Sequence, residues 1–469
     1  MKKIWVLAVL FFISCRKESP GSKPLQVANG PLPVTVVINA DLPGNVIPLN
    51  FEGVSYETRI LTRSPDVLNA NNKVLIQLFK NLGPGILRIG GDSSDQISWT
   101  DNQGTNTSTD LLNRSDIDRL SAFSRAIGWP VLFGLNLGNN NVTAAANEAQ
   151  YTYNSLQGNL YAFQFGNEPD IYSQNGLRNK TYSFGDYQTD WNSYFSVIRT
   201  TTPNAAFAGP DVAYDIDWLP QFSQNEGNNV NLIDGHYYLI GPATDPSIIY
   251  STLLHNDSRL NDVVQTLSKT SSQYNIPYRI TECNNVFGGG KAGVSDVFAS
   301  ALWALDFMWI VASNNGQGVN FHGGDGLFYS PVTIQNGVTT VNPEYYAMLA
   351  FKYGSTGGTI ISTTVSKSAY NCSAYACANA NKTMSVTLIN KEEAIEVSFA
   401  VQLTKAVTSI TVIRLSAPSV TASAGTTFAG SMVNTDGTFT PGNPEQYAVN
   451  QNSFTIKVPS GSAAIITMQ

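Results

Sequence analysis

Charged side chains are scarce in this sequence, and basic ones are not in excess. Of the 469 residues, 13% are charged, and the formal net charge is -7. The phosphates of a nucleic acid would be repelled by a surface of that sign, so we expect no nucleic-acid partner. A hydrophobic content of 42% is typical of a globular protein. Few charges and loops rich in Asn, Ser, Thr and Gly favour a secreted protein that handles neutral or weakly charged sugars.

Histidine and cysteine, which bind most protein metals, are also few. The chain has three histidines and four cysteines, and none of their spacings resembles a metal site. The run Gly288-Gly289-Gly290 lacks the Lys-Ser or Lys-Thr pair that a phosphate-binding loop requires. We therefore expect neither a metal nor a cofactor. Cys283 has no histidine near it in sequence, so we interpret it as a packed thiol rather than a nucleophile.

Two further cysteines lie close together in the C-terminal part of the chain. Cys372 and Cys377 can form a disulfide across a β-hairpin if the protein folds in an oxidising periplasm. The sequence leaves open whether they are bridged.

The N-terminus has the features of an export signal. Lys2-Lys3 is a basic pair, and Ile4 to Ile13 form an apolar stretch that is too short to span a bilayer. The stretch ends at Ser14-Cys15, in an arrangement that resembles a bacterial lipoprotein signal with a lipidated Cys15. We expect residues 1–22 to be signal and linker, with the protein lipid-anchored at the periplasm or cell surface. Simple secretion is the alternative.

Short apolar runs alternate with helical stretches over residues 48–354. Near-continuous apolar strands separated by amphipathic helices are what a parallel sheet buried on both faces needs, and a closed β/α barrel has eight such strands. A helix that begins at Pro343, with proline in its favoured first-turn position, is expected to close the barrel. The eight runs are Gly53–Glu57, Ile86–Gly91, Val131–Leu137, Ala162–Phe165, Ala205–Gly209, Leu232–Tyr238, Tyr278–Thr281 and Gly318–Gly324.

The pattern changes after Gly354. Residues 355–469 contain strand-like segments separated by turn residues, which predicts an antiparallel β-sandwich. Residues 23–47 include a strand-like segment that we expect to join this second domain. The predicted fold class is therefore α/β: a (β/α)8 TIM barrel with a C-terminal antiparallel β-sandwich that includes an N-terminal strand.

Two acids stand at the carboxyl ends of predicted barrel strands. Glu168 follows the fourth run, next to Asn167, and Glu282 follows the seventh. Strand ends of such a barrel share one mouth, so both acids are expected to face one cleft. Retaining glycosidases need a protonated acid and a carboxylate nucleophile about 5–5.5 Å apart. We assign Glu168 as general acid/base, Glu282 as nucleophile and Asn167 as a partner of the sugar 2-OH.

Three more side chains near the strand ends are candidates for the same site. Arg88 lies inside an apolar run, where a buried guanidinium needs an anionic partner, and either catalytic acid can serve. His236 is expected to orient the catalytic pair, whereas we interpret His322 as a buried barrel histidine. Glu57 follows the first run and is expected to hold sugar hydroxyls.

These motifs together resemble glycoside hydrolase family 79, which contains β-glucuronidases and heparanase. The resemblance extends from about Gly53 to Phe351. Besides the two acids, it rests on the Gly-rich loop after Glu282 and on four other segments: Leu87–Gly91, His236–Tyr238, Phe321–Gly324 and Pro343–Tyr345.

The resemblance implies a glycan substrate with a terminal β-glucuronic acid. Its 6-carboxylate would be held by hydroxyls of Tyr237 and Tyr345 and by the backbone amides of Gly288, Gly289 and Gly290. Asp95 matches an acidic substrate-binding position of the family. The alternative for Asp95 is capping of a loop or helix entry.

Phe287 departs from the pattern of the family. The family usually has Tyr before the glycines, so one hydroxyl donor to the carboxylate is missing here. A glycosidase for a neutral or 4-O-methylated sugar is therefore an alternative, and Lys291 is either a compensating cation or a solvated side chain. A non-catalytic glycan-binding surface lipoprotein is a third hypothesis.

Overall fold

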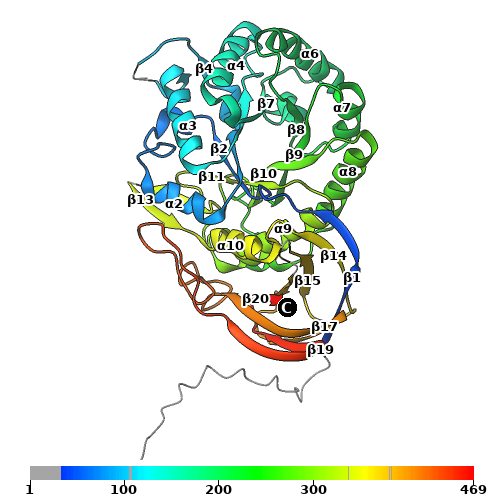
Figure 1. Cartoon of the computed structure of the whole chain (residues 1–469). Helices are drawn as coiled ribbons and strands as arrows, with labels where there is room; N and C mark the ends of the chain where they lie inside the picture. Colours follow the sequence, from blue (N-terminus) through cyan, green and yellow to red (C-terminus); the bar gives the residue numbers. More distant parts are fainter. Residues whose placement is uncertain (1–32, 105–107, 336, 380, 382) are drawn as a thin grey trace, which may run out of the picture.

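The structure is a computed structural model that describes residues 33–104, 108–335, 337–379, 381 and 383–469. Its larger part is a parallel β/α barrel surrounded by helices, and its smaller part is an antiparallel β-domain below that barrel (Figure 1). Both parts confirm the predicted fold class. The signal and lipid-anchor prediction, including Cys15, lies outside the described residues.

Eight parallel strands form the barrel, in the spatial order β7-β6-β3-β2-β11-β10-β9-β8. A parallel bridge between Phe163 and Phe207 joins β7 to β8, which brings the two edges of the sheet together. The strands are β2 (Gly53–Glu57), β3 (Ile86–Gly90), β6 (Val131–Leu135), β7 (Leu160–Phe165), β8 (Ala208–Val212), β9 (Leu232–Ile240), β10 (Tyr278–Val286) and β11 (Val319–Gly323).

Helices follow the strands and cover the outside of the barrel (Figure 1). Their ends follow local sequence signals: α3 begins at a capping box of Asn113 and Asp116, and it ends at Gly128 with a left-handed φ of 76°. The α-helices are α1 (Ile60–Arg63), α2 (Lys73–Leu82), α3 (Arg114–Ile127), α4 (Val142–Leu156), α5 (Tyr172–Asn175), α6 (Phe184–Thr201), α7 (Trp218–Glu226), α8 (Ser258–Tyr274), α9 (Phe298–Ser313) and α10 (Pro343–Ser355). Short 3-10 helices are η1 (Asp92–Asp95), η2 (Gln157–Asn159), η3 (Pro169–Ile171) and η4 (Tyr250–Leu254).

The β-domain is one sheet that curls around its own apolar core. Because β1 pairs antiparallel with β14 and parallel with β17, the strand at the N-terminal end closes the sheet, as predicted. The strands are β1 (Val34–Val46), β14 (Thr359–Val365), β15 (Cys372–Ala378), β16 (Met384–Asn390), β17 (Val397–Ser416), β18 (Thr427–Phe428), β19 (Glu445–Val458) and β20 (Ser462–Met468). Two small ribbons complete the set: β4 (Ser98–Trp99) with β5 (Leu111–Leu112), and β12 (Val332–Gln335) with β13 (Val338–Val341).

Helix α9 lies between the barrel and the β-domain. It is apolar on nearly all sides and is buried along almost its whole length, as expected for a helix with protein on both faces. The domain boundary that we expect at residues 354 and 355 falls at the end of α10, and it stays a prediction. Within the described residues, no helix combines the length and the apolar character needed to cross a bilayer.

The two C-terminal cysteines are not bridged. Cys372 and Cys377 are both free, and they lie on the same strand, β15. They are five positions apart, so strand alternation directs them to opposite faces of the sheet. Cys377 is buried in the core shared with the barrel, and Cys372 packs against the core of the β-domain. The question that the sequence left open is therefore answered: the structure has no disulfide between Cys372 and Cys377.

Candidate active site

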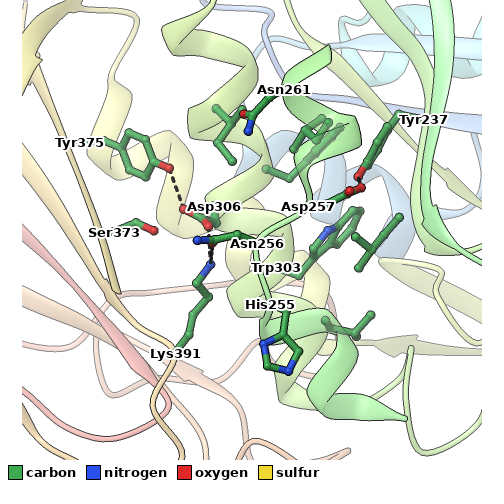
Figure 2. A pocket seen from close by; sticks show the side chains of 15 residues that line it. Tyr237, His255, Asn256, Asp257, Asn261, Trp303, Asp306, Ser373, Tyr375 and Lys391 are labelled. Carbon is green, nitrogen blue, oxygen red and sulfur yellow. Dashed lines mark hydrogen bonds and ion pairs between the residues drawn. The ribbon is translucent and has the colours of Figure 1, made fainter. Parts of the chain in front are cut away.

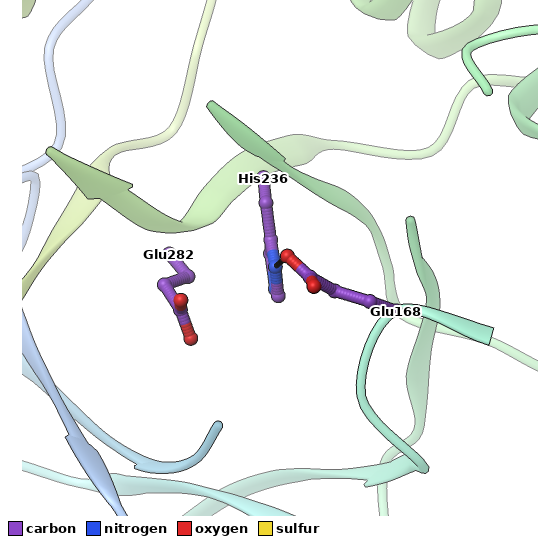
Figure 3. Close-up of side chains that lie close together, drawn as sticks. All are labelled: Glu168, His236 and Glu282. Carbon is purple, nitrogen blue, oxygen red and sulfur yellow. Dashed lines mark hydrogen bonds and ion pairs between the residues drawn. The ribbon is translucent and has the colours of Figure 1, made fainter. Parts of the chain in front are cut away.

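The two predicted catalytic acids meet at the mouth of the barrel. Glu168 follows β7, Glu282 is on β10, and His236 of β9 lies between them (Figure 3). One carboxylate oxygen of each acid and one ring nitrogen of His236 all lie within 4.8 Å of one another. The fold thus brings together two carboxyl groups that are more than a hundred residues apart in sequence.

A β-bulge turns Glu282 toward the centre of the barrel. The pairing of β10 with β9 shifts register between Ile280 and Glu282, which leaves Thr281 as an extra residue. As a result, neighbouring residues point the same way: the Thr281 hydroxyl donates to Asp211, and Glu282 contacts the guanidinium of Arg88. Regular alternation would have placed one of the two outside the barrel.

Arg88 is the buried cation of the site. The sequence left open whether Glu168 or Glu282 is its partner, and the structure shows that it is Glu282. The Nη1 of Arg88 donates to Glu282 Oε2 at 2.7 Å, and its Nη2 donates to Asp211 Oδ2 at 2.7 Å. The guanidinium also donates to Asn167, Gln164 and Ser55 at 2.9–3.0 Å. A fully buried guanidinium with two carboxylates and three neutral acceptors has its charge and its donors satisfied.

His236 links the second acid to the same network. Its Nδ1 lies 2.9 Å from Glu168 Oε1, and its Nε2 lies 2.9 Å from Asp211 Oδ1. Burial by itself lowers the pKa of His236, but Asp211, Glu282 and Glu168 outweigh it and raise that pKa well above its usual value. We therefore treat His236 as an imidazolium at neutral pH.

The environments of the two acids push their pKa values apart. Burial raises the pKa of Glu168 to about 7, against the opposing effect of His236. Burial also acts to raise the pKa of Glu282, but the nearby His322, His236 and Arg88 lower it to about 2. A proton donor beside an ionised carboxylate is what acid-assisted nucleophilic displacement needs at neutral pH.

Asp95 is a structural residue rather than a substrate-binding one. Only 1% of it is exposed, and its oxygens accept hydrogen bonds from the amides of Leu137, Gly138 and Asn167 and from the hydroxyl of Tyr172. The predicted contact with sugar is wrong, because every side of this carboxylate is taken up by protein donors. Asp95 instead fixes the backbone at Asn167, next to Glu168.

Asn167 and Asp92 lie beside each other at the rim. Asn167 accepts from Arg88 through Oδ1 and donates from Nδ2 to Asp92 Oδ1 at 3.1 Å. Asp92 is exposed on η1, so of the two aspartates it is Asp92, and not the predicted Asp95, that is open to solvent beside Asn167. The prediction that Asn167 contacts the sugar 2-OH stays a prediction.

Tyr237 faces away from the site, and its neighbour Tyr238 faces into it. The Tyr238 hydroxyl donates to Glu282 Oε1 at 2.8 Å. The Tyr237 hydroxyl donates to Asp257 outside the barrel, where it lines a cavity of about 270 Å³ at the junction with the β-domain. Figure 2 shows Tyr237 with Asp257 at one side of this cavity and Lys391 with Asp306 at another. The predicted role of Tyr237 in binding substrate is therefore wrong.

Tyr345 is also remote from the catalytic pair. It is 1% exposed on α10, and its hydroxyl donates to the carbonyl of Leu78 on α2 at 2.7 Å. The side chain of Asn81 donates to the same hydroxyl. Tyr345 joins two outer helices, so the prediction that it binds the carboxylate of the sugar is wrong.

The Gly-rich loop lies where the sequence predicts it, at the end of β10. Gly288, Gly289 and Gly290 all have positive φ, 85°, 95° and 76°, which only glycine adopts without strain. A Cβ on Gly290 would meet the backbone of Tyr329 at 2.6 Å. Within the described residues, the amides of Gly288 and Gly289 have no protein acceptor, so they are free to bind an anion.

Phe287 and Lys291 flank this loop. Phe287 is half-buried, and its ring centroid is 6.4 Å from that of Tyr238, which contacts Glu282. Lys291 donates to the carbonyls of Asp245 and Ile248 at 2.6 and 2.8 Å. It is therefore neither a solvated side chain nor a ligand of the sugar, because it ties the Gly-rich loop to the loop after β9.

His322 lies next to Glu282, and Glu57 lies next to His322. His322 Nδ1 lies 3.4 Å from Glu282 Oε2, and its Nε2 lies 3.7 Å from Glu57 Oε1. Glu57 accepts from the amide of Ser93 at 2.8 Å and lines a cavity of about 190 Å³. His322 is buried, as expected, but it also touches the catalytic network, which the sequence interpretation had not favoured.

Sequence reasoning missed several polar residues that contact Arg88, His236, Glu282 or one another. The strongest omission is Asp211, which contacts both Arg88 and His236. A signal was present for Tyr238, because a strand that directs His236 inward also directs the residue two positions later inward. The other missed residues are Asp92, Gln164, Asp234 and Thr281.

Glu168, His236 and Glu282 have the donor types and spacing that a metal site also shows. Glu282 is already paired with Arg88, however, and both ring nitrogens of His236 bond to carboxylates. The residues present therefore do not fit a metal, and we assign none to them.

Comparisons with known proteins agree with this arrangement. Residues 62–308 match the model of the glycosyl hydrolase family 79 N-terminal domain, and residues 374–465 match that of the family 79 C-terminal beta domain. A β-glucuronidase of Aspergillus niger is 26% identical over 308 residues, which cover 56% of this chain and 56% of that protein. Heparanase-like protein 3 of Arabidopsis thaliana is 24% identical over 368 residues, which cover 72% of this chain and 68% of that protein.

A solved structure shows the same fold at lower identity. The crystal structure of a 4-O-α-L-rhamnosyl-β-D-glucuronidase from Fusarium oxysporum 12S superposes with a TM-score of 0.74 at 17% identity, over 92% of this chain and 100% of that one. The chain thus matches a whole solved structure in fold, but only about half the length of the Aspergillus relative in sequence.

Proposed function

This chain belongs to glycoside hydrolase family 79, and we propose that it is a retaining β-glycosidase that releases a terminal β-glucuronic acid, or a modified β-uronide, from a glycan. The observation that carries the proposal is the separation of the two carboxyl groups. Oxygens of Glu168 and Glu282 lie within 4.8 Å of each other. So close an approach suits the retaining mechanism, at about 5–5.5 Å, better than the separation of about 6.5–9.5 Å that the inverting mechanism needs for its water.

The proposed reaction is a double displacement. In the first step, Glu282 Oε attacks the anomeric carbon while Glu168 gives its proton to the leaving oxygen, so a glycosyl ester forms and the aglycone leaves as an alcohol. In the second step, Glu168 takes a proton from water, whose oxygen attacks the same carbon, and Glu282 is released as a carboxylate. The raised pKa of Glu168 and the lowered pKa of Glu282 support these roles.

The sugar class is proposed from the loop after β10. The unpaired amides of Gly288 and Gly289 suit a carboxylate, which dipoles can bind without a full positive charge. The two relatives and the solved structure are named as a β-glucuronidase, a heparanase-like protein and a rhamnosyl-glucuronidase. Phe287 favours a second candidate, a neutral or 4-O-methylated β-sugar, because it offers no hydroxyl to the carboxylate.

A panel of aryl β-glycosides tests both candidates. The wild type should cleave the β-glucuronide or its 4-O-methyl derivative best, and the first product should be the β-anomer by NMR. Glu282→Gln and Glu168→Gln should each abolish turnover while both variants stay folded. Sugar binding without turnover across the whole panel would instead identify a glycan-binding protein, and a neutral glycoside as the best substrate would select the second candidate.

Export and lipidation at Cys15 are proposed from the N-terminal sequence alone. Metabolic labelling with a fatty-acid analogue tests this: Cys15→Ala should remove the label and release the protein from the membrane fraction.

A further inference from the structure

We propose that Asp211 is a positioning residue shared by both predicted catalytic carboxylates. It acts on Glu282 through Arg88 and on Glu168 through His236. The inference rests on the proposed glycosidase function, and it names a residue that the two-acid mechanism does not itself require.

Asp211 is the point at which the two halves of the site join. It is 1% exposed and accepts hydrogen bonds from four side chains, so no part of it reaches the substrate. Oδ2 accepts from Arg88 at 2.7 Å, and Oδ1 accepts from His236 at 2.9 Å. Oδ1 also accepts from Gln164 at 2.6 Å and from Thr281 at 2.8 Å. Since Arg88 holds the nucleophile and His236 holds the acid, one carboxylate orients both.

The backbone at Asp211 is built for this purpose. The pairing of β8 with β9 shifts register between Pro210 and Val212, so Asp211 is the extra residue of a β-bulge. The backbone φ of Asp211 is +60°, and that of Glu168 is +53°. Residues other than glycine rarely adopt such values. The amide of Glu168 donates to the carbonyl of Asp211 at 3.0 Å. Strained residues that are held in place by their surroundings cluster at functional sites.

Asp211 also balances the charge that moves during catalysis. Before the first displacement Glu282 is negative and Glu168 is neutral; afterwards Glu282 is an ester and Glu168 is negative. Arg88 and His236 carry two positive charges, and the fixed charge of Asp211 reduces their sum to one. That single positive charge matches the single negative charge of the reacting pair, so the charges of these five groups sum to zero before and after the first displacement.

Without the anion of Asp211, two buried cations would repel each other and His236 would lose its proton. The ionisable and charged groups around His236 are Arg88 on β3, Asp92 on η1, Glu168 after β7, Asp211 on β8, Asp234 on β9 and Glu282 on β10. His236 contacts two of these carboxyl groups, Glu168 and Asp211. Asp211 is the one of the two that does not react.

The test is the pH dependence of kcat/KM for Asp211→Asn on the aryl glycoside that the wild type cleaves best. In the wild type, the alkaline limb should reflect Glu168, near pH 7. In the variant, loss of the adjacent imidazolium should raise the pKa of Glu168, because an opposite charge at 4–6 Å lowers a carboxyl pKa by about 1–3. The alkaline limb should therefore move up by about 1 pH unit or more, with KM little changed.

Asp234→Asn is the matched control. Asp234 is also fully buried, it accepts from Gln164 at 2.7 Å, and it bonds the backbone of Asp211. Burial raises its pKa well above the usual value, and its side-chain hydrogen bonds go to Gln164 and to the backbone of Asp211 rather than to His236. Its replacement alters buried hydrogen bonds next to Asp211 but removes no contact of His236, so the limbs should stay where they are in the wild type. The proposal is overturned if Asp211→Asn keeps the wild-type limbs, or if Asp234→Asn shifts them equally.

A second readout does not depend on activity. The chain has only three histidines, so the ring nitrogens of His236 can be assigned by NMR with variants of the other two. His236 should stay protonated above neutral pH in the wild type and titrate near its ordinary value in Asp211→Asn. A neutral His236 in the wild type overturns the proposal even if no substrate has been found, whereas an inactive wild type with a protonated His236 counts against the proposed function alone.

If Asp211→Asn does not fold, His236→Gln replaces it. Glutamine can form hydrogen bonds with both Glu168 and Asp211 but carries no charge. The alkaline limb of this variant should therefore also move to higher pH. A limb at the wild-type position in that variant would overturn the proposal.

Discussion

Replacing the proposed acid should stabilise the fold at neutral pH while it abolishes turnover. Glu168 has a folded pKa of about 7 against an ordinary value of 4.5. Between those two pH values the folded protein holds a proton that the unfolded chain has released, so stability falls as pH rises. At about 1.4 kcal/mol per pH unit, the burial of Glu168 costs about 3 kcal/mol above pH 7. Glu168→Gln removes that cost, so its advantage over the wild type should grow from near zero at about pH 4 to about 3 kcal/mol at about pH 8.

Replacing the proposed nucleophile should have the opposite sign. The folded pKa of Glu282 is about 2, below the ordinary value of 4.5. The carboxylate therefore contributes stability that is present above about pH 4.5 and is lost as pH falls through about 2. The same arithmetic gives about 3 kcal/mol. The loss of Glu282 also leaves Asp211 as the one carboxylate paired with both Arg88 and His236, so one of these two buried positive charges is no longer balanced. Glu282→Gln should thus destabilise the protein at neutral pH.

Unfolding followed by tryptophan fluorescence measures both effects. All tryptophans of the described residues lie between Trp99 and Trp309, so the signal reports the barrel rather than the β-domain. Urea denaturation of the wild type and the two variants at about pH 5 and about pH 8 gives the differences directly. Equal destabilisation by Glu168→Gln at both pH values would refute the reasoning, because its predicted benefit depends on the charge that Glu168 acquires.

Three further substitutions test the positions of single hydroxyls. Tyr238→Phe removes a hydrogen bond to an ionised carboxylate, worth about 1.5–3 kcal/mol, so kcat/KM should fall about 10- to 150-fold. Tyr237→Phe should leave kcat/KM unchanged, because that hydroxyl lies outside the barrel; equal losses in both variants would contradict this assignment. Phe287→Tyr should raise kcat/KM for a β-glucuronide by up to the same factor relative to the β-glucoside. An unchanged ratio of the two substrates would show that position 287 does not contact the carboxylate.

The sequence was most informative where the chemistry depends on local order. A short apolar run followed by Asn-Glu-Pro predicts a strand and an acid at its end, and Glu168 lies there. The same reasoning places Glu282 and the Gly-rich loop at one mouth. The second domain could be foreseen because turn residues replace helical periodicity after Gly354. These features depend on a few consecutive residues, which a single sequence displays.

Assignments taken only from the family pattern were less secure. Tyr345 and Asp95 match positions of the motif, but each satisfies its polar groups with protein partners and stays buried. A motif records that a residue type occurs, and it does not record which way its side chain points. Tyr237 fails for a reason that the sequence did contain, because a strand that turns His236 into the barrel must turn the next residue out.

Two β-bulges explain why the floor of the site could not be predicted. A bulge at Asp211 and another at Thr281 each insert one residue, and each changes which side chains face inward from that point on. Strict alternation would make Thr281 and Glu282 point apart, yet both contact the same charged cluster. The local pattern of apolar and polar residues does not predict such an insertion, because the position of a bulge is set by the pairing with neighbouring strands. The acids of a barrel can therefore be found from strand ends, whereas the groups that hold and charge them require the register of the whole sheet.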